Sequence, residues 1–385
     1  MYQAYQDRYR PLDEAPDGAE YGIVTRDSYA EAVAKLYDST PMRVDGVPYP
    51  QLRDKAVISH KDMNFSVGDI EGVGRVVFFA PKNHKSLNGF LIQQSGYMQP
   101  PTSMLTDKIL EALIPIMEAR GIIGVAYAHG GRGSPDLVTH QGRWGVKTLQ
   151  AHIAKQVTIL LGALHHEFAD HNESMTVPPI ALMGHSQGGQ TIAHELSDPG
   201  AYGFAEGQIR GATLINSVAL PHSQAMLRTP GFLTNIAWRA LSDVTRSLFS
   251  GEGFLLRNED AFRAFIGEGD PKSASAHRMT SSTLPAETAW FVQTLTSGTS
   301  PKLNPDLVRG MPISLVTSVN DQLMGAYAQK MTHNHVVSSE ADVLWKEVPG
   351  RHFSPIMLSG DESIVRVLEI IRGNSAAFEH ALQNM

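Results

Sequence analysis

A serine between two glycines stands where an apolar run meets a helix-forming segment. Residues 178–183 are mostly apolar, residues 184–188 read Gly-His-Ser-Gln-Gly, and a helix-compatible segment follows from 190 to 196. A strand that turns sharply into a helix pushes the intervening side chain out at the carboxyl edge of a sheet. The glycines keep neighbouring chain clear of that turn. The segment therefore predicts a strand, a tight turn and a helix, with Ser186 presented as a nucleophile.

Apolar runs and amphipathic segments alternate on both sides of this motif. Alternation of this kind predicts a mostly parallel sheet with right-handed helical crossovers. The expected strands are residues 57–59, 63–67, 74–80, 89–94, 122–128, 212–218, 312–319 and 343–348. The expected helices are residues 28–37, 105–119, 146–169 and 362–371. The sequence thus predicts the α/β class, with a central sheet flanked by helices.

The alternation stops between residues 221 and 304, where helix-like pieces occur without a convincing core strand. We interpret this stretch as an inserted helical cap. It would separate an N-terminal extension (1–53) and a first part of the core (54–220) from a second part with a C-terminal helix (305–385). Some apolar cap residues are expected to line a substrate pocket, because they exceed what a few helices need for their own packing. They are Phe232, Leu233, Trp238, Leu241, Phe249, Leu255, Leu256 and Phe265.

The composition excludes several classes of protein. The 385 residues are 42% apolar, which is ample for a core, and the absence of cysteine rules out disulfides and thiolate chemistry. A net charge of −7 without a basic block argues against nucleic acid or an anionic membrane as partner. The polar amino terminus and the absence of a long apolar run predict a cytoplasmic protein without a spanning helix. No phosphate-binding glycine loop and no convincing set of metal ligands occur, so neither a cofactor nor a metal is expected.

Two further segments complete a recognisable pattern. His352 lies in residues 349–355, directly after the last expected strand, and Asp321 lies just past the strand at 312–319. With Ser186 they follow the chain order of the α/β-hydrolase superfamily, which the chain resembles over about residues 54–373. The resemblance implies a triad in which His352 is the general base and Asp321 orients its imidazole. An alternative reading has Asp321 capping the helix that follows.

Backbone donors for an oxyanion are implied by the same resemblance. One is the amide of Gln187. The second is the amide of Tyr97, in a loop where the superfamily often has His-Gly and this chain has Ser-Gly, so that Gly96 matches. A competing choice is the sequence His-Gly-Gly at 129–131, in the next loop along the chain.

Contacts with the substrate are expected from residues around this site. They are Gly96, His185, Phe232 and Trp238. The resemblance implies a serine hydrolase that cleaves a small-molecule carboxylic ester or thioester through an acyl-enzyme. An acyltransferase or cyclase with the same triad is one alternative, and a non-catalytic receptor on the same fold is another. Retention of all three triad residue types speaks against the receptor, and the sequence leaves the oligomeric state open.

Overall fold

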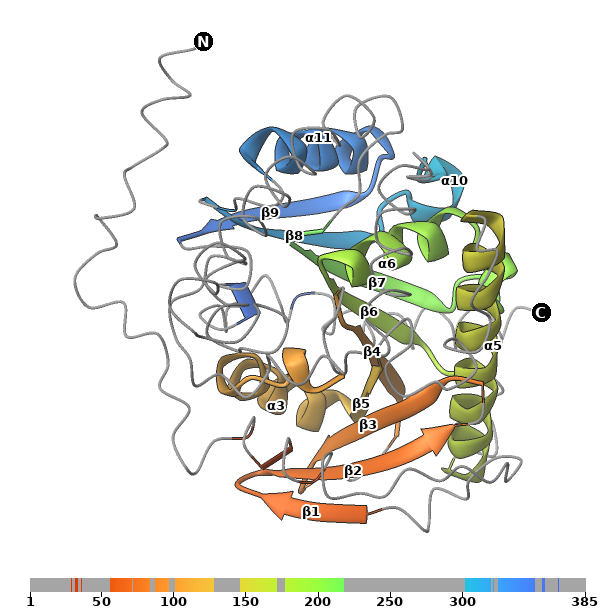
Figure 1. Ribbon diagram of the computed structural model, residues 1–385, viewed down its shortest axis with the longest axis vertical. Coiled ribbons are helices and arrows are strands. Elements are labelled where there is room, and N and C mark those ends of the chain that lie inside the picture. Colours follow the sequence, from red (N-terminus) through yellow and green to blue (C-terminus); the bar gives the residue numbers. More distant parts are fainter. Residues whose placement is uncertain are drawn as a thin grey trace, which may run out of the picture.

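Nine strands form one sheet in the computed structural model (Figure 1). Single residues described outside the longer segments are Tyr29, Ala32, Val33, Leu36, Asp321, Pro355, Ile356 and Arg366. The longer described segments are residues 56–70, 72–83, 87–96, 101–127, 146–171, 177–217, 302–319 and 325–349.

The sheet is mostly parallel, as predicted. Its strand order is β1-β2-β3-β5-β4-β6-β7-β8-β9. Strands β1, β2 and β3 pair antiparallel, β3 pairs antiparallel with β5, and all later neighbours are parallel. The strands are β1 Ala56–His60, β2 Met63–Ile70, β3 Gly74–Pro81, β4 Gly89–Gln94, β5 Ile122–Tyr127, β6 Ile180–His185, β7 Ile209–Ile215, β8 Pro312–Ser318 and β9 Asp342–Val348.

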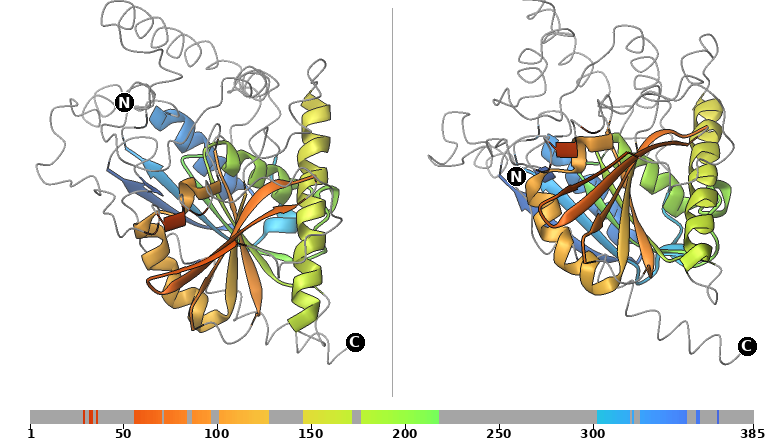
Figure 2. Two further views of the ribbon diagram at one scale, coloured as in Figure 1. Left: turned by 60° about the horizontal axis from the view of Figure 1, so that its bottom comes forward. Right: turned by 90° about the horizontal axis from the view of Figure 1, so that it is seen from below.

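Helices cover both faces of the sheet (Figure 2). The helix α3 packs on one face, whereas α5 and α6 pack on the other. The α-helices are α3 Asp107–Arg120, α5 Val146–His171, α6 Gln187–Ser197, α10 Pro305–Val308 and α11 Gly325–Ser338. Two short 3-10 helices are η2 Pro101–Met104 and η3 Gly200–Tyr202. Among the described residues, no helix is both long and apolar enough to cross a bilayer.

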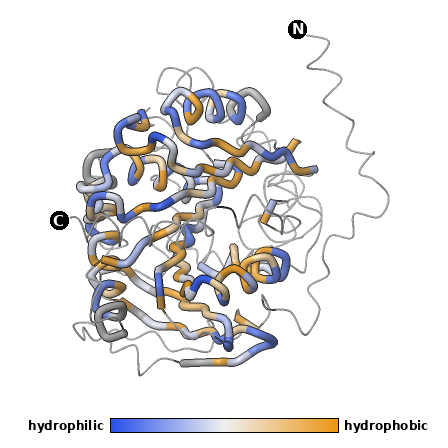
Figure 3. Tube along the Cα trace, turned by 180° about the vertical axis from the view of Figure 1, so that it is seen from behind, coloured by the Kyte–Doolittle hydropathy of each residue, from blue (hydrophilic) through white to orange (hydrophobic). Residues whose placement is uncertain are grey.

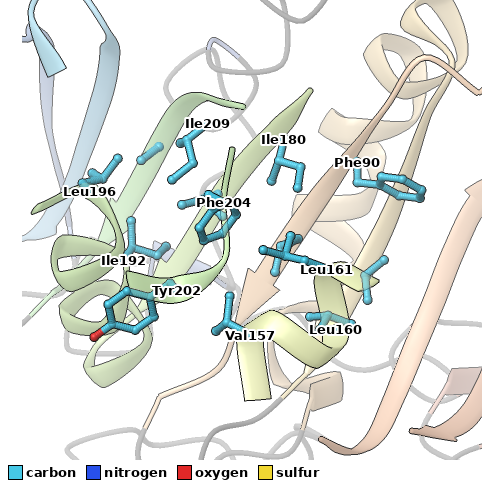
Figure 4. Close-up of a cluster of buried hydrophobic side chains, with 14 of the residues drawn as sticks. Phe90, Val157, Leu160, Leu161, Ile180, Ile192, Leu196, Tyr202, Phe204 and Ile209 are labelled. Atoms are coloured by element: carbon cyan, nitrogen blue, oxygen red, sulfur yellow. The ribbon is translucent and has the colours of Figure 1, made fainter. Parts of the chain in front are cut away.

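The alternation of side chains along the strands divides the core into two layers. In β4, Phe90 and Ile92 belong to the cluster under α5 and α6, whereas Leu91 belongs to the cluster under α3. Apolar residues run through these central strands in Figure 3, and Figure 4 shows the first cluster closely. Because successive side chains point to opposite faces, Gln94 falls on the same side as Phe90 and Ile92.

Helix α3 shows why its predicted limits were nearly correct. Thr106 occupies the N-cap and accepts a hydrogen bond from the amide of Ile109 at 3.5 Å. Gly121 ends the helix in the left-handed conformation, with φ of 67°, which glycine adopts without a steric penalty. The capping threonine and the terminating glycine lie next to the helix in the chain, so both ends of the helix can be predicted from the sequence.

Strand β7 differs from its predicted range of 212–218. It begins three residues earlier, because Ile209 pairs with Ile180 of β6. It ends earlier because Asn216 has a positive φ of 42°, which is incompatible with an extended strand. The apolar run in the sequence was therefore a poor guide to the end of this strand.

Several predictions lie largely outside the described residues. The cap predicted at 221–304 is described only at residues 302–304, and the helix predicted at 362–371 only at Arg366, which is helical. For the helix predicted at 28–37, the four described residues are helical. Three of these, Tyr29, Val33 and Leu36, are buried in the cluster on the α3 face.

Candidate active site

Ser186 has a strained backbone at the junction of β6 and α6. Its φ of 53° and ψ of −114° fall outside the regions that a residue with a side chain normally adopts. The amide of Ser186 donates to the carbonyl of Ile215 at 2.9 Å, so the neighbouring strand β7 holds the strained residue in place. The predicted turn from strand to helix is confirmed, and strain of this kind commonly marks a functional position.

Three glycines make this tight turn sterically possible. A Cβ at Gly184 would lie 2.6 Å from the carbonyl carbon of Gly188, and one at Gly188 would lie 2.0 Å from the carbonyl oxygen of Gln94. A Cβ at Gly189 would lie 1.6 Å from the Oγ of Ser217. Real Cβ contacts are never this short, so the close packing requires all three glycines. The sequence pattern singled out Gly184 and Gly188 but missed the role of Gly189.

The hydroxyl of Ser186 is not used to cap the helix that it precedes. Ser186 occupies the N-cap position of α6, yet its side chain makes no capping bond to the described first turn. Gln187 is the first residue of α6, and amides in the first turn of a helix lack an intrahelical acceptor. The helix therefore presents amide donors and the positive end of its dipole beside the serine.

The candidate acid follows β8, two strands away from the elbow. Asp321 is 3% exposed, and its amide donates to the carbonyl of Ser318 at 3.3 Å. The same carbonyl accepts a hydrogen bond from the side chain of Gln329 at 3.1 Å. Helix α11 is described from Gly325, four residues after Asp321. Residues 322–324 lie outside the described part of the chain, so the triad role and the capping role of Asp321 both stay predictions.

Asn216 links the elbow region to the candidate acid, and it was not among the residues selected from the sequence. Its Nδ2 donates to the Oγ of Ser318 at 2.9 Å, and its Oδ1 accepts from the amide of Ser318 at 2.8 Å. Its own amide donates to the carbonyl of Val316 at 2.8 Å. A polar residue directly after an apolar strand was the only signal in the sequence.

The loop that carries the candidate base leaves the same edge of the sheet. Ser318 and Val348 are register partners at the ends of β8 and β9, and the amide of Val319 donates to the carbonyl of Val348 at 3.0 Å. His352 follows Val348 by four residues and lies outside the described part of the chain. The loop that leads to His352 therefore begins next to the segment that leads to Asp321.

The first of the two candidate oxyanion loops begins against helix α6. Strand β4 is the direct neighbour of β6, whereas β5 lies one strand farther away. A Cβ at Gly188 would also meet the carbonyl oxygen of Ser95 at 2.9 Å, which shows how closely the loop after β4 approaches the elbow. Gly96 is buried there. Tyr97 and the competing residues 129–131 lie outside the described residues.

The remaining predicted contacts are only partly described. His185 is fully buried as the last residue of β6. Phe232, Trp238 and the other cap residues lie outside the described part of the chain. Within the described ranges, no group of three or more His, Asp or Glu side chains is placed to hold a metal ion.

A buried carboxyl group lies near the far end of α6 and was also missed. Glu195 is fully buried, and the Nε2 of Gln94 donates to both of its carboxyl oxygens at 2.8 Å. Burial raises the pKa of Glu195 to about 8, and the bond from Gln94 lowers it in part. The group is therefore mostly protonated at neutral pH.

The chain was also compared with known proteins. No family model and no curated protein matches it. Brefeldin A esterase, described as a bacterial homologue of human hormone sensitive lipase, is 16% identical with a TM-score of 0.44, covering 90% of this chain and 84% of that one. An S-formylglutathione hydrolase from Agrobacterium tumefaciens is 9% identical with a TM-score of 0.47, covering 82% and 98%. An esterase from Thermogutta terrifontis is 14% identical with a TM-score of 0.42, covering 84% and 98%.

Likenesses at this level of identity concern the fold alone. The fold is identified by features of the chain itself. Six parallel strands in the order β5-β4-β6-β7-β8-β9 have the serine elbow between the inner strand β6 and the helix α6. Ser186 itself is 8% exposed, and a strained serine between a strand and a helix of such a sheet is a feature of the α/β-hydrolase fold. The chain has the α/β-hydrolase fold.

Proposed function

We propose that this protein is a serine hydrolase that cleaves a carboxylic ester or thioester of a small molecule through an acyl-enzyme. Ser186 is the nucleophile, His352 the general base and Asp321 the residue that orients the imidazole. The amides of Gln187 and Tyr97 form the oxyanion hole. No metal or cofactor takes part in this scheme.

The conformation of Ser186 is the observation that carries the proposal. A serine with φ of 53° is costly to maintain, and the glycine packing and the bond to Ile215 maintain it. The result is a hydroxyl beside the amino end of α6 that makes no capping bond there. A role in folding would not require this arrangement, whereas a nucleophile beside backbone donors does.

The proposed reaction has two halves. In the first, the Oγ of Ser186 bonds to the carbonyl carbon of the substrate while its proton passes to His352. The bond to the leaving oxygen or sulfur then breaks, and His352 returns the proton to the departing alcohol or thiol. In the second half, water attacks the acyl-enzyme, gives its proton to His352 and releases the acid, after which Ser186 regains its proton.

The order of the strands supports the assignment of the three catalytic residues. Ser186 follows β6, Asp321 follows β8 and His352 follows β9, and these strands end at one edge of the sheet. Adjacent strands are about 4.8 Å apart, so β9 lies about 14 Å from β6, and the four residues from Val348 to His352, at about 3.3 Å each, are long enough for the imidazole to reach back across this edge. The same geometry favours the loop after β4 over the loop after β5 for the second oxyanion donor, because β4 is adjacent to β6.

A fluorophosphonate probe tests the nucleophile directly. We expect the wild-type protein to be labelled at Ser186 and to hydrolyse p-nitrophenyl esters or acyl thioesters. Ser186→Ala should lose both properties, with a loss of rate of several orders of magnitude, while its circular dichroism and melting temperature stay close to the wild-type values. Near-normal turnover by Ser186→Ala would refute the proposal. Product analysis with added alcohols or amines separates transfer to water from transfer to another acceptor.

A further inference from the structure

Helix α6 touches one residue of the neighbouring strand at two separate points. Gly188, in its first turn, packs against the carbonyl oxygen of Gln94, where a Cβ would come within 2.0 Å. Glu195, in its last turn, accepts hydrogen bonds from the side chain of Gln94 at 2.8 Å. Gly188 and Glu195 are seven residues apart, which places them on one face of the helix. One residue of β4 therefore contacts both ends of the helix that carries the nucleophile.

The contact between Glu195 and Gln94 is completely enclosed. Both side chains are 0% exposed, in the layer between the sheet and helices α5 and α6. The ionisable groups that face the carboxyl are Tyr127 of β5 and Tyr202 of η3, and Asp198 lies beside Tyr202. No salt bridge connects a described Lys or Arg to Glu195. Most of the side chains in this layer are apolar, and Figure 4 shows part of them.

A directional contact at this place has a specific effect. Apolar packing between a helix and a sheet lets the helix slide by a fraction of an ångström at little cost, because dispersion is not directional. Hydrogen bonds from Gln94 favour a single position of Glu195 along the strand. Gln94 is also the last residue of β4, so Ser95 and Gly96 follow it directly. The position of α6 is thereby coupled to the start of the loop after β4.

We propose that Glu195 and Gln94 are a positioning pair that fixes α6, and with it the amide of Gln187, relative to the end of β4. This inference rests on the proposed function, in which the amide of Gln187 on α6 is an oxyanion donor. Neither side chain touches the reacting atoms. They act indirectly, because the contact sets the position of the main chain of α6 and of the residues that follow Gln94.

Replacement of each partner by leucine tests the pair. The variants are Gln94→Leu, Glu195→Leu and the double variant, together with Glu195→Gln, which resembles the protonated acid in shape. Leu196→Ala is the matched control, because Leu196 is buried on the same helix and makes no contact of this kind. Three quantities are measured: the rate at which a fluorophosphonate modifies Ser186, kcat and KM for a p-nitrophenyl ester, and amide hydrogen exchange at residues 95–96 and 187–189.

The expected results separate positioning from simple packing. Each leucine variant should lower kcat and the phosphonylation rate by about 10- to 100-fold while KM changes by less than about threefold, because a misplaced donor acts on the transition state. The double variant should lose no more than either single variant, since both remove one contact. Glu195→Gln should stay within about threefold of the wild type. Leu196→Ala should lower the melting temperature without changing these rates.

Two outcomes would overturn the proposal. One is that the leucine variants keep the wild-type rates, or that their losses add in the double variant. The other is that hydrogen exchange at residues 95–96 and 187–189 is the same in all variants. This second readout does not depend on catalysis, so it decides on the pair even if the wild-type protein is unreactive and the proposed function fails. Faster exchange at 95–96 and 187–189 in the leucine variants than in Leu196→Ala supports positioning. Equal exchange in all variants contradicts it.

Discussion

The side chain of Asn216 and the residue Ser318 are joined by two hydrogen bonds across the ends of β7 and β8, at 2.8 and 2.9 Å. On one side, Asn216 follows Ile215, whose carbonyl accepts a hydrogen bond from the amide of Ser186. On the other side, the carbonyl of Ser318 binds the amide of Asp321. A single carboxamide therefore lies between the elbow and the candidate acid.

We expect Asn216→Ala to destabilise the protein by about 2–4 kcal/mol, because it removes two hydrogen bonds to the buried Ser318 and places alanine at a positive φ. Asn216→Gly should be less harmful, because glycine accepts the backbone conformation although it loses the same bonds. Urea unfolding of the three proteins measures both effects. If the alanine and glycine variants are equally stable, the backbone strain at this position is negligible.

The pH dependence of the reaction tests the assignment of the base. If His352 accepts the proton of Ser186, kcat/KM should rise with pH through an apparent pKa of about 6 to 7.5, as the imidazole becomes neutral. His352→Ala should abolish this activity, and Asp321→Asn should reduce kcat by up to about 10⁴-fold. A His352→Ala protein with the normal rate and pH profile would show that another histidine is the base.

The parts of the fold that the sequence predicted are those with local causes. The elbow, the limits of α3 and most strands follow from glycines, caps and apolar runs that lie close together in the chain. The pairs Asn216 with Ser318 and Gln94 with Glu195 depend on strand order, which joins residues about one hundred positions apart. No local pattern indicates such partners. The end of β7 was missed for a related reason, since the conformation of Asn216 is set by its bonds to β8.

The contact between Gly189 and Ser217 gives a sharper steric prediction. Gly189→Ala should cost about 1–3 kcal/mol or more, because the new methyl group overlaps Ser217. The double variant Gly189→Ala/Ser217→Gly removes the overlapping atoms and should recover much of this loss. Ser217→Gly alone serves as the control, and thermal or urea unfolding provides the measurement. Absence of any recovery would place the strain elsewhere in the elbow.

The protonation of Glu195 predicts how stability changes with pH. Burial raises its folded-state pKa from 4.5 to about 8, so between these values the folded chain keeps a proton that the unfolded chain has lost. The free energy of unfolding should therefore fall as pH rises from 4.5 to 8, by at most about 1.4 kcal/mol per pH unit, and level off above that range. Glu195→Gln should remove this contribution and become more stable than the wild type as pH approaches 8. Parallel stability curves for the two proteins would contradict the prediction.

The proposed cap predicts a change in selectivity. If Phe232 or Trp238 lines the acyl pocket, alanine at that position should alter the ratio of kcat/KM between short and long acyl esters by about 10-fold or more. A hydrolysis series from acetyl to decanoyl esters measures this ratio. Variants that lose stability but keep the same preference would place the acyl pocket elsewhere.

The long separation of the paired residues has a consequence for folding. Gln94 and Glu195 are 101 residues apart in sequence, and Asn216 and Ser318 are 102 apart. Contacts of this kind form slowly, because large loops must close before the contacts stabilise anything. Helices can form while both pairs are still separate, so we expect a refolding chain to regain its far-ultraviolet signal well before Ser186 reacts with a fluorophosphonate. The rate at which a fluorophosphonate labels Ser186 during refolding would then report on the last stage of folding.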